Sequence, residues 1–344
     1  MRIVVDVMGG DHGPEVLIDG ARLALEDNSK ISELFLVGRE DEIRAAMRNT
    51  GCNDSRIRIV HASEVLTMDD KPVEGLRRKK DCSILRAVDL VKDGKADAII
   101  STGNTGGIVA ASTIRLRPIA GIDRPSIATV IPAPENEFVL IDSGASVECK
   151  PHHLLHFAVM GKIYSQQILG YKNPRVGILS NGTETNKGTE LTQEAYKLCQ
   201  LADLNFIGYV EGHDLFHNRV DVVVCDGFIG NIVLKTIESF ARGLVGWLKD
   251  ELSKNPKRML GAMLAANALR TIKRRMDPDG PGGAPLLGLN GTVMKVHGSA
   301  KAKAMTNAIR VTSDAVAHQI NQSIREEIAA ANARVESQKQ PQPA

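Results

Sequence analysis

Short apolar runs rich in β-branched residues alternate along the chain with longer amphipathic segments. Runs such as 98–101 and 221–225 are apolar on both faces, which is typical of buried parallel strands. We expect strands at 2–7, 33–37, 56–60, 96–101, 127–131, 138–142, 175–180, 205–210 and 220–225. We expect helices at 15–26, 41–48, 84–92, 153–169, 188–201, 231–248 and 300–331. This alternation predicts an α/β fold with a mainly parallel, layered sheet.

The length of the chain sets its domain organisation. Its 344 residues are enough for one large domain or two moderate ones. We find no fixed-period repeat, and we expect residues 1–330 to form one α/β unit with two lobes around a cleft. The last residues are rich in Gln, Pro and Lys, so we expect 331–344 to be a disordered tail.

Five expected strands end in glycine-rich polar turns. These turns lie at 8–11, 101–107, 142–146, 180–188 and 226–231. A glycine in any single turn often serves only to relieve a positive φ. Five turns that combine Gly with Asn, Thr, Asp or Lys favour anion binding, because backbone N–H groups and helix N-termini bind phosphate. The pattern predicts a phosphate-containing ligand in a cleft at the strand ends.

Composition excludes several other classes of protein. The 43 Lys and Arg residues nearly balance the 41 Asp and Glu residues, and aromatic residues are only 3% of the chain, so we expect no nucleic-acid partner. The 5 cysteines are scattered without CxxC spacing, which argues against a disulfide framework. The N-terminus lacks the features of a signal peptide, and no apolar run is long enough to span a membrane. We therefore expect a cytoplasmic location.

Motifs for several cofactor-dependent and nucleophilic enzymes are absent. The chain has no GxxxxGK[ST] or GxSxG motif, and no GxGxxG follows the first expected strand. Two histidine pairs have i, i+4 spacing, His152 with His156 and His213 with His217, but neither pair carries the HExxH glutamate. We interpret these histidines as surface or capping residues and expect no metal.

Eight short motifs occur in an order and spacing that match a known family. They are DVMGGD at 6–11, KP at 71–72, GNTG at 103–106, RP at 124–125, FAVMG at 157–161, VEG at 210–212, CDGFIGN at 225–231 and GGAPLLG at 282–288. Together they resemble bacterial phosphate acyltransferase, the acyl-carrier-protein:phosphate transacylase of phospholipid synthesis. The resemblance covers nearly the whole chain.

The resemblance implies a reaction, a fold and a set of partners. An acyl-carrier-protein thioester and inorganic phosphate would give acyl phosphate and free carrier. The product would supply a membrane glycerol-3-phosphate acyltransferase. The implied fold is a Rossmann-like layered sheet related to the phosphotransacetylase and isopropylmalate dehydrogenase group, in a homodimer without cofactors.

This chemistry needs only positioning and charge stabilisation. Phosphate is itself the nucleophile and a thiolate leaves readily, so the site must hold a dianion against a carbonyl and stabilise the oxyanion. We expect catalytic roles for Lys187, Asn231 and His297. The residues expected to bind phosphate or substrate are Gly9, Gly10, Asp11, Gly103, Asn104, Thr105, Gly106, Asp142, Asn181 and Gly230.

Each of the stronger candidates also has a structural interpretation. Asn231 could be only a helix N-cap, and Lys187 could be a solvated residue at a helix start. Asp142 could cap a helix or orient a neighbour, and His297 could be a packed structural histidine.

Three positions depart from the family pattern. Cys82 precedes Ser83 where paired serines are expected, Ser146 stands where Asn is expected, and His156 stands where Gln is expected. We therefore assign no catalytic role to residues 82, 146 and 156.

A first basic cluster comprises Arg77, Arg78, Lys79 and Lys80. It is either a solvated helix face or a docking surface for the acyl-carrier protein, which is acidic as a class.

The second basic cluster flanks an apolar segment within residues 256–276. Its apolar residues do not form one clean helical face, so we expect a bent pair of short helices with breaks at Asn267 and 278–281. The segment is either a dimer interface or buried helix, or a contact with an anionic membrane surface. The residues expected to meet lipid are Met259, Leu260, Met263 and Leu264.

Three function classes remain open at this point. The first is the carrier-protein-dependent phosphate acyltransferase. The second is a coenzyme-A-dependent phosphotransacylase of short acyl groups. The third is a membrane-associated scaffold of lipid synthesis without catalytic activity.

Overall fold

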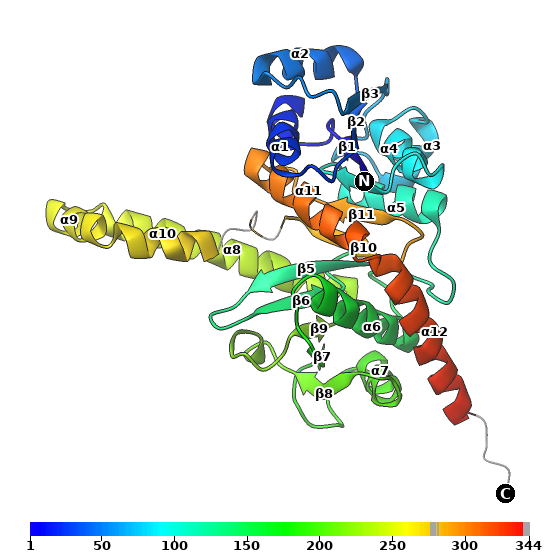
Figure 1. The fold of residues 1–344 in the computed structure, drawn as a ribbon. Helices are drawn as coiled ribbons and strands as arrows, with labels where there is room; N and C mark the ends of the chain where they lie inside the picture. Colours follow the sequence, from blue (N-terminus) through cyan, green and yellow to red (C-terminus); the bar gives the residue numbers. More distant parts are fainter. Residues whose placement is uncertain (276–279, 281, 340–344) are drawn as a thin grey trace, which may run out of the picture.

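A computed structural model describes residues 1–275, 280 and 282–339 of the chain (Figure 1). Its centre is one sheet of 11 strands in the order β3-β2-β1-β4-β11-β10-β5-β6-β9-β7-β8. The strands are β1 (Arg2–Asp6), β2 (Glu33–Gly38), β3 (Ile57–His61), β4 (Ala98–Ser101), β5 (Ser126–Pro132), β6 (Glu137–Ile141), β7 (Arg175–Leu179), β8 (Asn205–Val210), β9 (Val222–Val224), β10 (Ala284–Leu287) and β11 (Thr292–Lys295).

Helices cover both faces of this sheet and extend beyond it (Figure 1). They are α1 (Pro14–Asp27), α2 (Glu40–Thr50), α3 (Pro72–Arg78), α4 (Ser83–Lys92), α5 (Thr105–Leu116), α6 (Pro151–Gln167), α7 (Glu190–Leu201), α8 (Gly227–Leu252), α9 (Pro256–Leu264), α10 (Ala266–Arg275), α11 (Ala302–Ala317) and α12 (Ile320–Lys339), with a 3₁₀ turn at Asp214–Phe216. Among the described residues, no helix is long and apolar enough to cross a membrane.

Strand direction divides the sheet into two lobes. Strands β3, β2, β1, β4 and β11 are parallel to one another and form the upper lobe, while β6, β9, β7 and β8 are parallel and form the lower lobe. Between the two lobes, β10 pairs antiparallel with both β11 and β5, and β5 pairs antiparallel with β6. Three successive reversals mean that the strands of the two lobes run in opposite directions. The mainly parallel α/β fold is confirmed, but the antiparallel ribbon and the β10–β11 hairpin were not predicted.

Alternating side chains of the strands pack against different helix layers. In β1, Ile3 and Val5 belong to the core beneath α1 and α11, whereas Val4 packs on the side of α4 and α5. In β6, Val139 packs towards α6, whereas Phe138 and Leu140 pack beneath the apolar side of α8. Both faces of the central strands are therefore buried, as their continuous apolar sequences predict.

The C-terminal segment differs from the sequence prediction in two respects. The single helix expected at 300–331 is broken by Gln319, which has a φ of 52°. Helix α12 then continues to Lys339, so a disordered tail beginning at residue 331 is wrong as far as 339, while 340–344 lie outside the described residues. Ala331 and Val335 are buried in the lower-lobe core, which explains why the helix persists.

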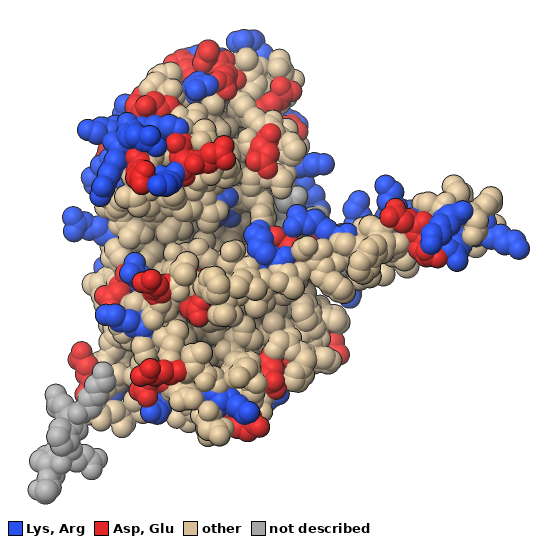
Figure 2. All heavy atoms as spheres, turned by 180° about the vertical axis from the view of Figure 1, so that it is seen from behind, with Lys and Arg blue, Asp and Glu red and all other residues tan. Residues whose placement is uncertain are grey.

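Helices α8, α9 and α10 form an arm that projects from the body of the molecule (Figures 1 and 2). The predicted pair of short helices is confirmed as α9 and α10, but the break falls at Ala265 and Asn267 lies inside α10. The second predicted break, 278–281, falls largely outside the described residues. No residue of α9 or α10 is buried in the single chain, so the buried-helix interpretation is wrong.

Candidate active site

Three strand ends of the lower lobe bring their turns together. Ile141 of β6 is in register with Val224 of β9, which is in register with Ile178 of β7. Because these strands are parallel, the turns at 142–146, 225–231 and 180–188 leave the same edge of the sheet side by side. Two of the three expected catalytic residues, Lys187 and Asn231, lie on these turns.

Asp142 organises the first of these turns from inside the protein. Its carboxylate is fully buried and accepts hydrogen bonds from the backbone N–H groups of Ile127 at 2.8 Å, Gly144 at 3.2 Å, Ala145 at 3.1 Å and Ser146 at 2.6 Å. Burial raises the pKa of Asp142 to about 6, although these four donors act in the opposite direction. Asp142 therefore orients its neighbours and shapes the turn, rather than contacting a ligand.

The start of α8 packs closely against the 142–146 turn and is hydrogen-bonded to it. The carboxylate of Asp226 is the N-cap and accepts from Ile229 N at 2.9 Å. Gly227 N donates to the carbonyl of Ser146 at 2.8 Å. Gly230 lies so close to the backbone of the 142–146 turn that a Cβ atom would be 1.9 Å from the carbonyl oxygen of residue 142. Gly230 therefore has a packing role here.

Asn231 lies in the second turn of α8 and is exposed. Since Asp226 is the N-cap, the interpretation of Asn231 as an N-cap is wrong. A Cβ atom built on Gly144 would lie 3.5 Å from Cβ of Asn231. The carboxamide thus borders the 142–146 turn at the positive end of the α8 dipole, which is a suitable place for a donor to an anion.

Lys187 lies on the neighbouring turn, just before α7. The Oδ1 atom of Asn181 accepts from Gly188 N at 3.0 Å and closes this turn. Gly188 has a φ of 85°, which allows the chain to reverse at this point. Lys187 itself is exposed, so its ammonium is accessible to a ligand at the lower-lobe edge.

The upper-lobe turns pack closely against each other. A Cβ atom on Gly9 would be 2.2 Å from Cα of Gly103, and one on Gly10 would be 3.2 Å from Oγ1 of Thr102. Asp11 N donates to the carbonyl of Gly298 at 2.8 Å. These glycines allow two turns and the segment after β11 to meet.

A buried polar row that the sequence analysis missed supports these turns. Asp6, Ser101 and Lys295 are register partners on β1, β4 and β11, and Ser101 Oγ donates to Asp6 at 2.8 Å. Lys295 Nζ donates to the carbonyl of Thr102 at 3.3 Å and to that of Val296. Burial lowers the pKa of Lys295 to about 8, and burial also raises the pKa of Asp6. The row was not predictable because β11 was not recognised as a strand.

The side chain of Asn104 is occupied by structural hydrogen bonds. Its Oδ1 accepts from Gly107 N at 2.9 Å and caps α5, while Nδ2 donates to the carbonyls of Thr67, Met68 and Asp70. In this structure the Asn104 carboxamide therefore holds the loop before α5 in place. Thr105 is exposed at the first position of α5, beside Gly106.

His297 lies at the opposite edge of the central ribbon from Lys187 and Asn231. Its Nε2 is 3.2 Å from Oε1 of Glu238 on α8. Seven residues separate Asn231 from Glu238, which is about 10 Å along the helix axis. The structure therefore brings Lys187 and Asn231 to one edge and places His297 at the other, with α8 spanning the two.

Two further charged residues of α8 belong to this arrangement. Asn231, Lys235 and Glu238 have the spacing i, i+4, i+7, so they form one stripe along the helix. Lys235 Nζ donates to Oε2 of Glu238 at 2.8 Å. Neither Lys235 nor Glu238 was predicted as a site residue, although their spacing from Asn231 could have indicated them.

The first basic cluster is divided by the structure. Arg77, Arg78 and Lys80 are exposed. Lys79 is instead half-buried and donates to Asp70 at 2.5 Å and to the carbonyl of Val65 at 2.9 Å. The Lys79 ammonium is thus occupied within the protein, and the exposed part of the predicted docking surface consists of the other three.

A histidine cluster lies at the start of α6. Asp123, His152 and His153 bring potential ligand atoms within 4.8 Å of one another. However, Nδ1 of His153 accepts from Lys150 N at 3.0 Å, so its lone pair is used and Nε2 carries the proton. The donor set does not fit a metal ion, and the cluster instead ties the start of α6 to the preceding loop through His152 and Asp123, 2.8 Å apart.

Comparisons with known proteins support one family. A family profile described as "Fatty acid synthesis protein" matches residues 1–323. A "Phosphate acyltransferase" from Pelotomaculum thermopropionicum is 47% identical over 328 residues, which is 95% of this chain and 95% of that protein. Another from Heliobacterium modesticaldum is 48% identical over 329 residues, covering 95% of this chain and 98% of that protein.

The chain belongs to the phosphate acyltransferase family. It is therefore an enzyme of the acyltransferase class, as the motifs predicted. A solved phosphotransacetylase from Streptococcus pyogenes shares the fold, with a TM-score of 0.60, 19% identity and coverage of 92% of this chain and 94% of that one. The expected structural relationship to the phosphotransacetylase group is confirmed.

Proposed function

We propose that this phosphate acyltransferase moves a fatty acyl group from an acyl-carrier-protein thioester to inorganic phosphate. The product is an acyl phosphate, which a membrane glycerol-3-phosphate acyltransferase consumes in phospholipid synthesis. The observation that carries the proposal is the lower-lobe edge, where the turns that carry Asp142, Asn231 and the exposed Lys187 follow the adjacent strands β6, β9 and β7. This edge offers cationic and neutral donors to an anion.

The reaction follows from that donor set. A phosphate oxygen attacks the thioester carbonyl, a C–O bond forms, and the C–S bond breaks with release of the carrier thiolate. Lys187 neutralises charge on the phosphate, and Asn231 donates to the oxygen on which negative charge develops. Asn181 and Asp142 hold the two turns in place. Phosphate is the nucleophile, so the proposed reaction needs no cofactor.

The exposed basic side chains of the first cluster suit an acidic carrier. Arg77 and Arg78 lie in the last turn of α3, whose first turn carries the exposed Val73, and Lys80 follows the helix. Figure 2 shows Lys and Arg side chains gathered along the edge of the upper lobe formed by α3 and α4. We propose that this surface attracts the carrier and raises its encounter rate.

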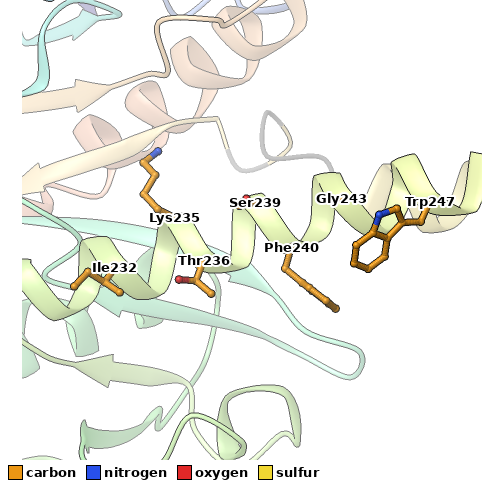
Figure 3. A pocket seen from close by; sticks show the side chains of 7 residues that line it. All are labelled: Ile232, Lys235, Thr236, Ser239, Phe240, Gly243 and Trp247. Carbon is orange, nitrogen blue, oxygen red and sulfur yellow. The ribbon is translucent and has the colours of Figure 1, made fainter.

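The side of α8 that faces away from the body suits a second copy of the chain. Phe240 and Trp247 are 62% and 67% exposed, a large apolar area for a single helix. They border a hollow of about 680 Å³ (Figure 3), lined by Ile232, Lys235, Thr236, Ser239, Phe240, Gly243 and Trp247. We propose that the homodimer forms across this face of α8.

The end of the arm suits a membrane surface. Met263 and Leu264 of α9 are 74% and 83% exposed, and Met259 and Leu260 are exposed beside them. Lys257 and Arg258 precede these residues, and basic side chains recur in the last turn of α10. We propose peripheral binding to the anionic cytoplasmic face of the membrane, with the apolar side chains inserted.

One assay separates the remaining functions. Purified protein is given palmitoyl-carrier protein or a short acyl-coenzyme A, with and without inorganic phosphate, and release of free thiol is measured. We expect phosphate-dependent release from the carrier substrate. Preference for the short acyl-coenzyme A would favour the short-chain phosphotransacylase, and no release from either would favour the scaffold.

A further inference from the structure

Glu238 joins Lys235 and His297, two side chains from different parts of the fold. His297 belongs to the segment between β11 and α11 in the upper lobe, and its Nε2 lies 3.2 Å from Oε1 of Glu238. The other carboxylate oxygen accepts from Lys235 Nζ at 2.8 Å. The Glu238 side chain is only 12% exposed, whereas that of His297 is 43% exposed. The carboxylate of Glu238 is thus largely buried, and it pairs with two side chains that are more exposed than it is.

Glu238 is fixed in place by the packing of α8. The helix is anchored to the 142–146 turn by Gly227 and Gly230, and Val233, Leu234 and Ile237 pack on the core beneath it. Figure 3 shows Lys235 projecting from the opposite side of α8 to Phe240. Lys235 borders the hollow on α8 from this side, and Glu238 faces the upper lobe through its contact with His297.

The protonation of Glu238 determines which nitrogen of His297 is free. Burial acts to raise the pKa of Glu238, but the hydrogen bonds from His297 and Lys235 outweigh it and bring the pKa to about 2. An ionised carboxylate only accepts hydrogen bonds, so Nε2 of His297 must carry a proton. Nδ1 is then the nitrogen available to a ligand, and in the imidazolium it is a donor.

We propose that Glu238 is a positioning residue that fixes His297 and Lys235 as donors to a phosphate group at the upper-lobe end of α8. This inference rests on the proposed function for its substrate. The ligand chemistry is a phosphate dianion or monoester, since the Lys235 ammonium is cationic and the neighbouring turns are rich in glycine.

Two substrates of the proposed reaction carry such a group. One is inorganic phosphate, and the other is the acyl-carrier protein, whose thiol is borne on an arm attached through a phosphate ester. The separation of about 10 Å along α8 between Asn231 and Glu238 is long for one phosphate ion but matches a longer substrate. The kinetic constants for the two substrates distinguish these sources.

The test uses the full-length protein with Glu238→Gln, and Glu251→Gln as the matched control. Glu251 is on the same helix and also pairs with two cations, Lys254 and Arg258, but it is exposed at the far end of α8, next to α9. We expect Glu238→Gln to raise one KM about tenfold, as for loss of a charge-assisted hydrogen bond, with a smaller change in kcat. A rise in the KM for inorganic phosphate identifies the free ion, and a rise in that for palmitoyl-carrier protein identifies the ester. An unchanged KM for inorganic phosphate together with an unchanged KM for palmitoyl-carrier protein would overturn the proposal.

A second measurement does not depend on activity. The protein contains 9 histidines, so selective ¹⁵N-histidine labelling gives a tractable spectrum in which His297→Gln identifies the His297 signals. We expect Nε2 of His297 to be protonated in the wild type and in Glu251→Gln, and its tautomer balance to change in Glu238→Gln. An unprotonated Nε2 in the wild type, or an identical His297 spectrum in Glu238→Gln, would contradict the positioning role. This readout stays decisive even if the carrier-dependent reaction is not observed.

Discussion

Gly144 lies directly against Asn231. A Cβ atom on Gly144 would be 3.5 Å from Cβ and 3.6 Å from Oδ1 of Asn231, and Gly144 has a φ of 134°. This conformation is accessible to glycine and strained for any residue with a side chain. The glycine thus keeps the space in front of the Asn231 carboxamide open.

We predict that Gly144→Ala lowers turnover about tenfold and costs about 1–3 kcal/mol in the free energy of unfolding. Gly170→Ala is the matched control, because Gly170 has a φ of 79° in the same lobe and nothing within 4 Å. The control should lose stability without losing turnover. Steady-state kinetics and urea unfolding of both variants measure the two effects, and equal turnover in the two variants would contradict the account of Gly144.

Charge reversal at Arg77 and Arg78 should weaken the encounter with the carrier. For Arg77→Glu, Arg78→Glu we expect the KM for palmitoyl-carrier protein to rise about tenfold and to lose most of its dependence on salt, with kcat nearly unchanged. Arg48→Glu, at an exposed position on α2, serves as the control. A KM that responds neither to salt nor to the double reversal would exclude this surface as the docking site.

Lys79 should behave differently from its neighbours. Because it bonds to Asp70 and the carbonyl of Val65, Lys79→Ala should lower the melting temperature while leaving the salt dependence of the carrier KM intact. Thermal unfolding and a salt series on the same preparation check this. A lost salt dependence with an unchanged melting temperature would return Lys79 to the docking surface.

The apolar end of the arm should determine membrane binding. We predict that Leu260→Glu, Leu264→Glu abolishes flotation with vesicles containing anionic lipid, since two buried charges replace inserted leucines. Ile114→Glu, Val147→Glu is the control, because both of these residues are 60% exposed but lie on the body of the molecule. Equal flotation of the two double variants would count against insertion of α9.

His153 should make stability depend on pH. Burial, followed by the nearby His152, lowers the pKa of His153 from 6.5 to about 4. Between these values the unfolded chain binds a proton that the folded ring does not, so the free energy of unfolding falls as the pH falls from 6.5 to 4. His153→Gln should flatten this dependence in urea unfolding at about pH 7 and about pH 5.

Asp142 contributes to the same range with the opposite sign. Its pKa is raised to about 6 in the folded state, so it favours folding as the pH falls below that value. This contribution is common to wild type and His153→Gln and cancels in their difference. An unchanged pH dependence in the variant would show that His153 does not resist protonation in the folded protein.

Local sequence patterns predicted most of the elements. Strand β8 was predicted at its observed bounds, and most other predicted strands and helices differ by a few residues. Helix α5 was missed because its first turn contains two glycines, Gly106 and Gly107. The helix is stabilised by the Asn104 cap and by burial of Ile108 and Ala111. The β10–β11 hairpin was missed because strands of only 4 residues each, APLL and TVMK, give little periodic signal.

The candidate site was predictable in its parts but not in its arrangement. Glycine turns and the residues Lys187 and Asn231 could be read from the sequence because each follows a strand. The separation of the upper-lobe turns from the lower-lobe turns could not be predicted from the sequence. It depends on three antiparallel pairings that involve β10 and β5. The contact between Glu238 and His297 joins residues far apart in the chain, and only the packing of α8 across β5 and β6 brings them together.

Formation of acyl phosphate from palmitoyl-carrier protein tests the central claim most directly. Free thiol and hydroxylamine-trapped acyl phosphate are measured in wild type, Lys187→Ala and the exposed control Lys172→Ala. We predict that both products form in equal amounts, that both require inorganic phosphate, and that Lys187→Ala reduces them about 10²-fold without a change in melting temperature. Thiol release without phosphate, or near wild-type product formation by Lys187→Ala, would contradict the account.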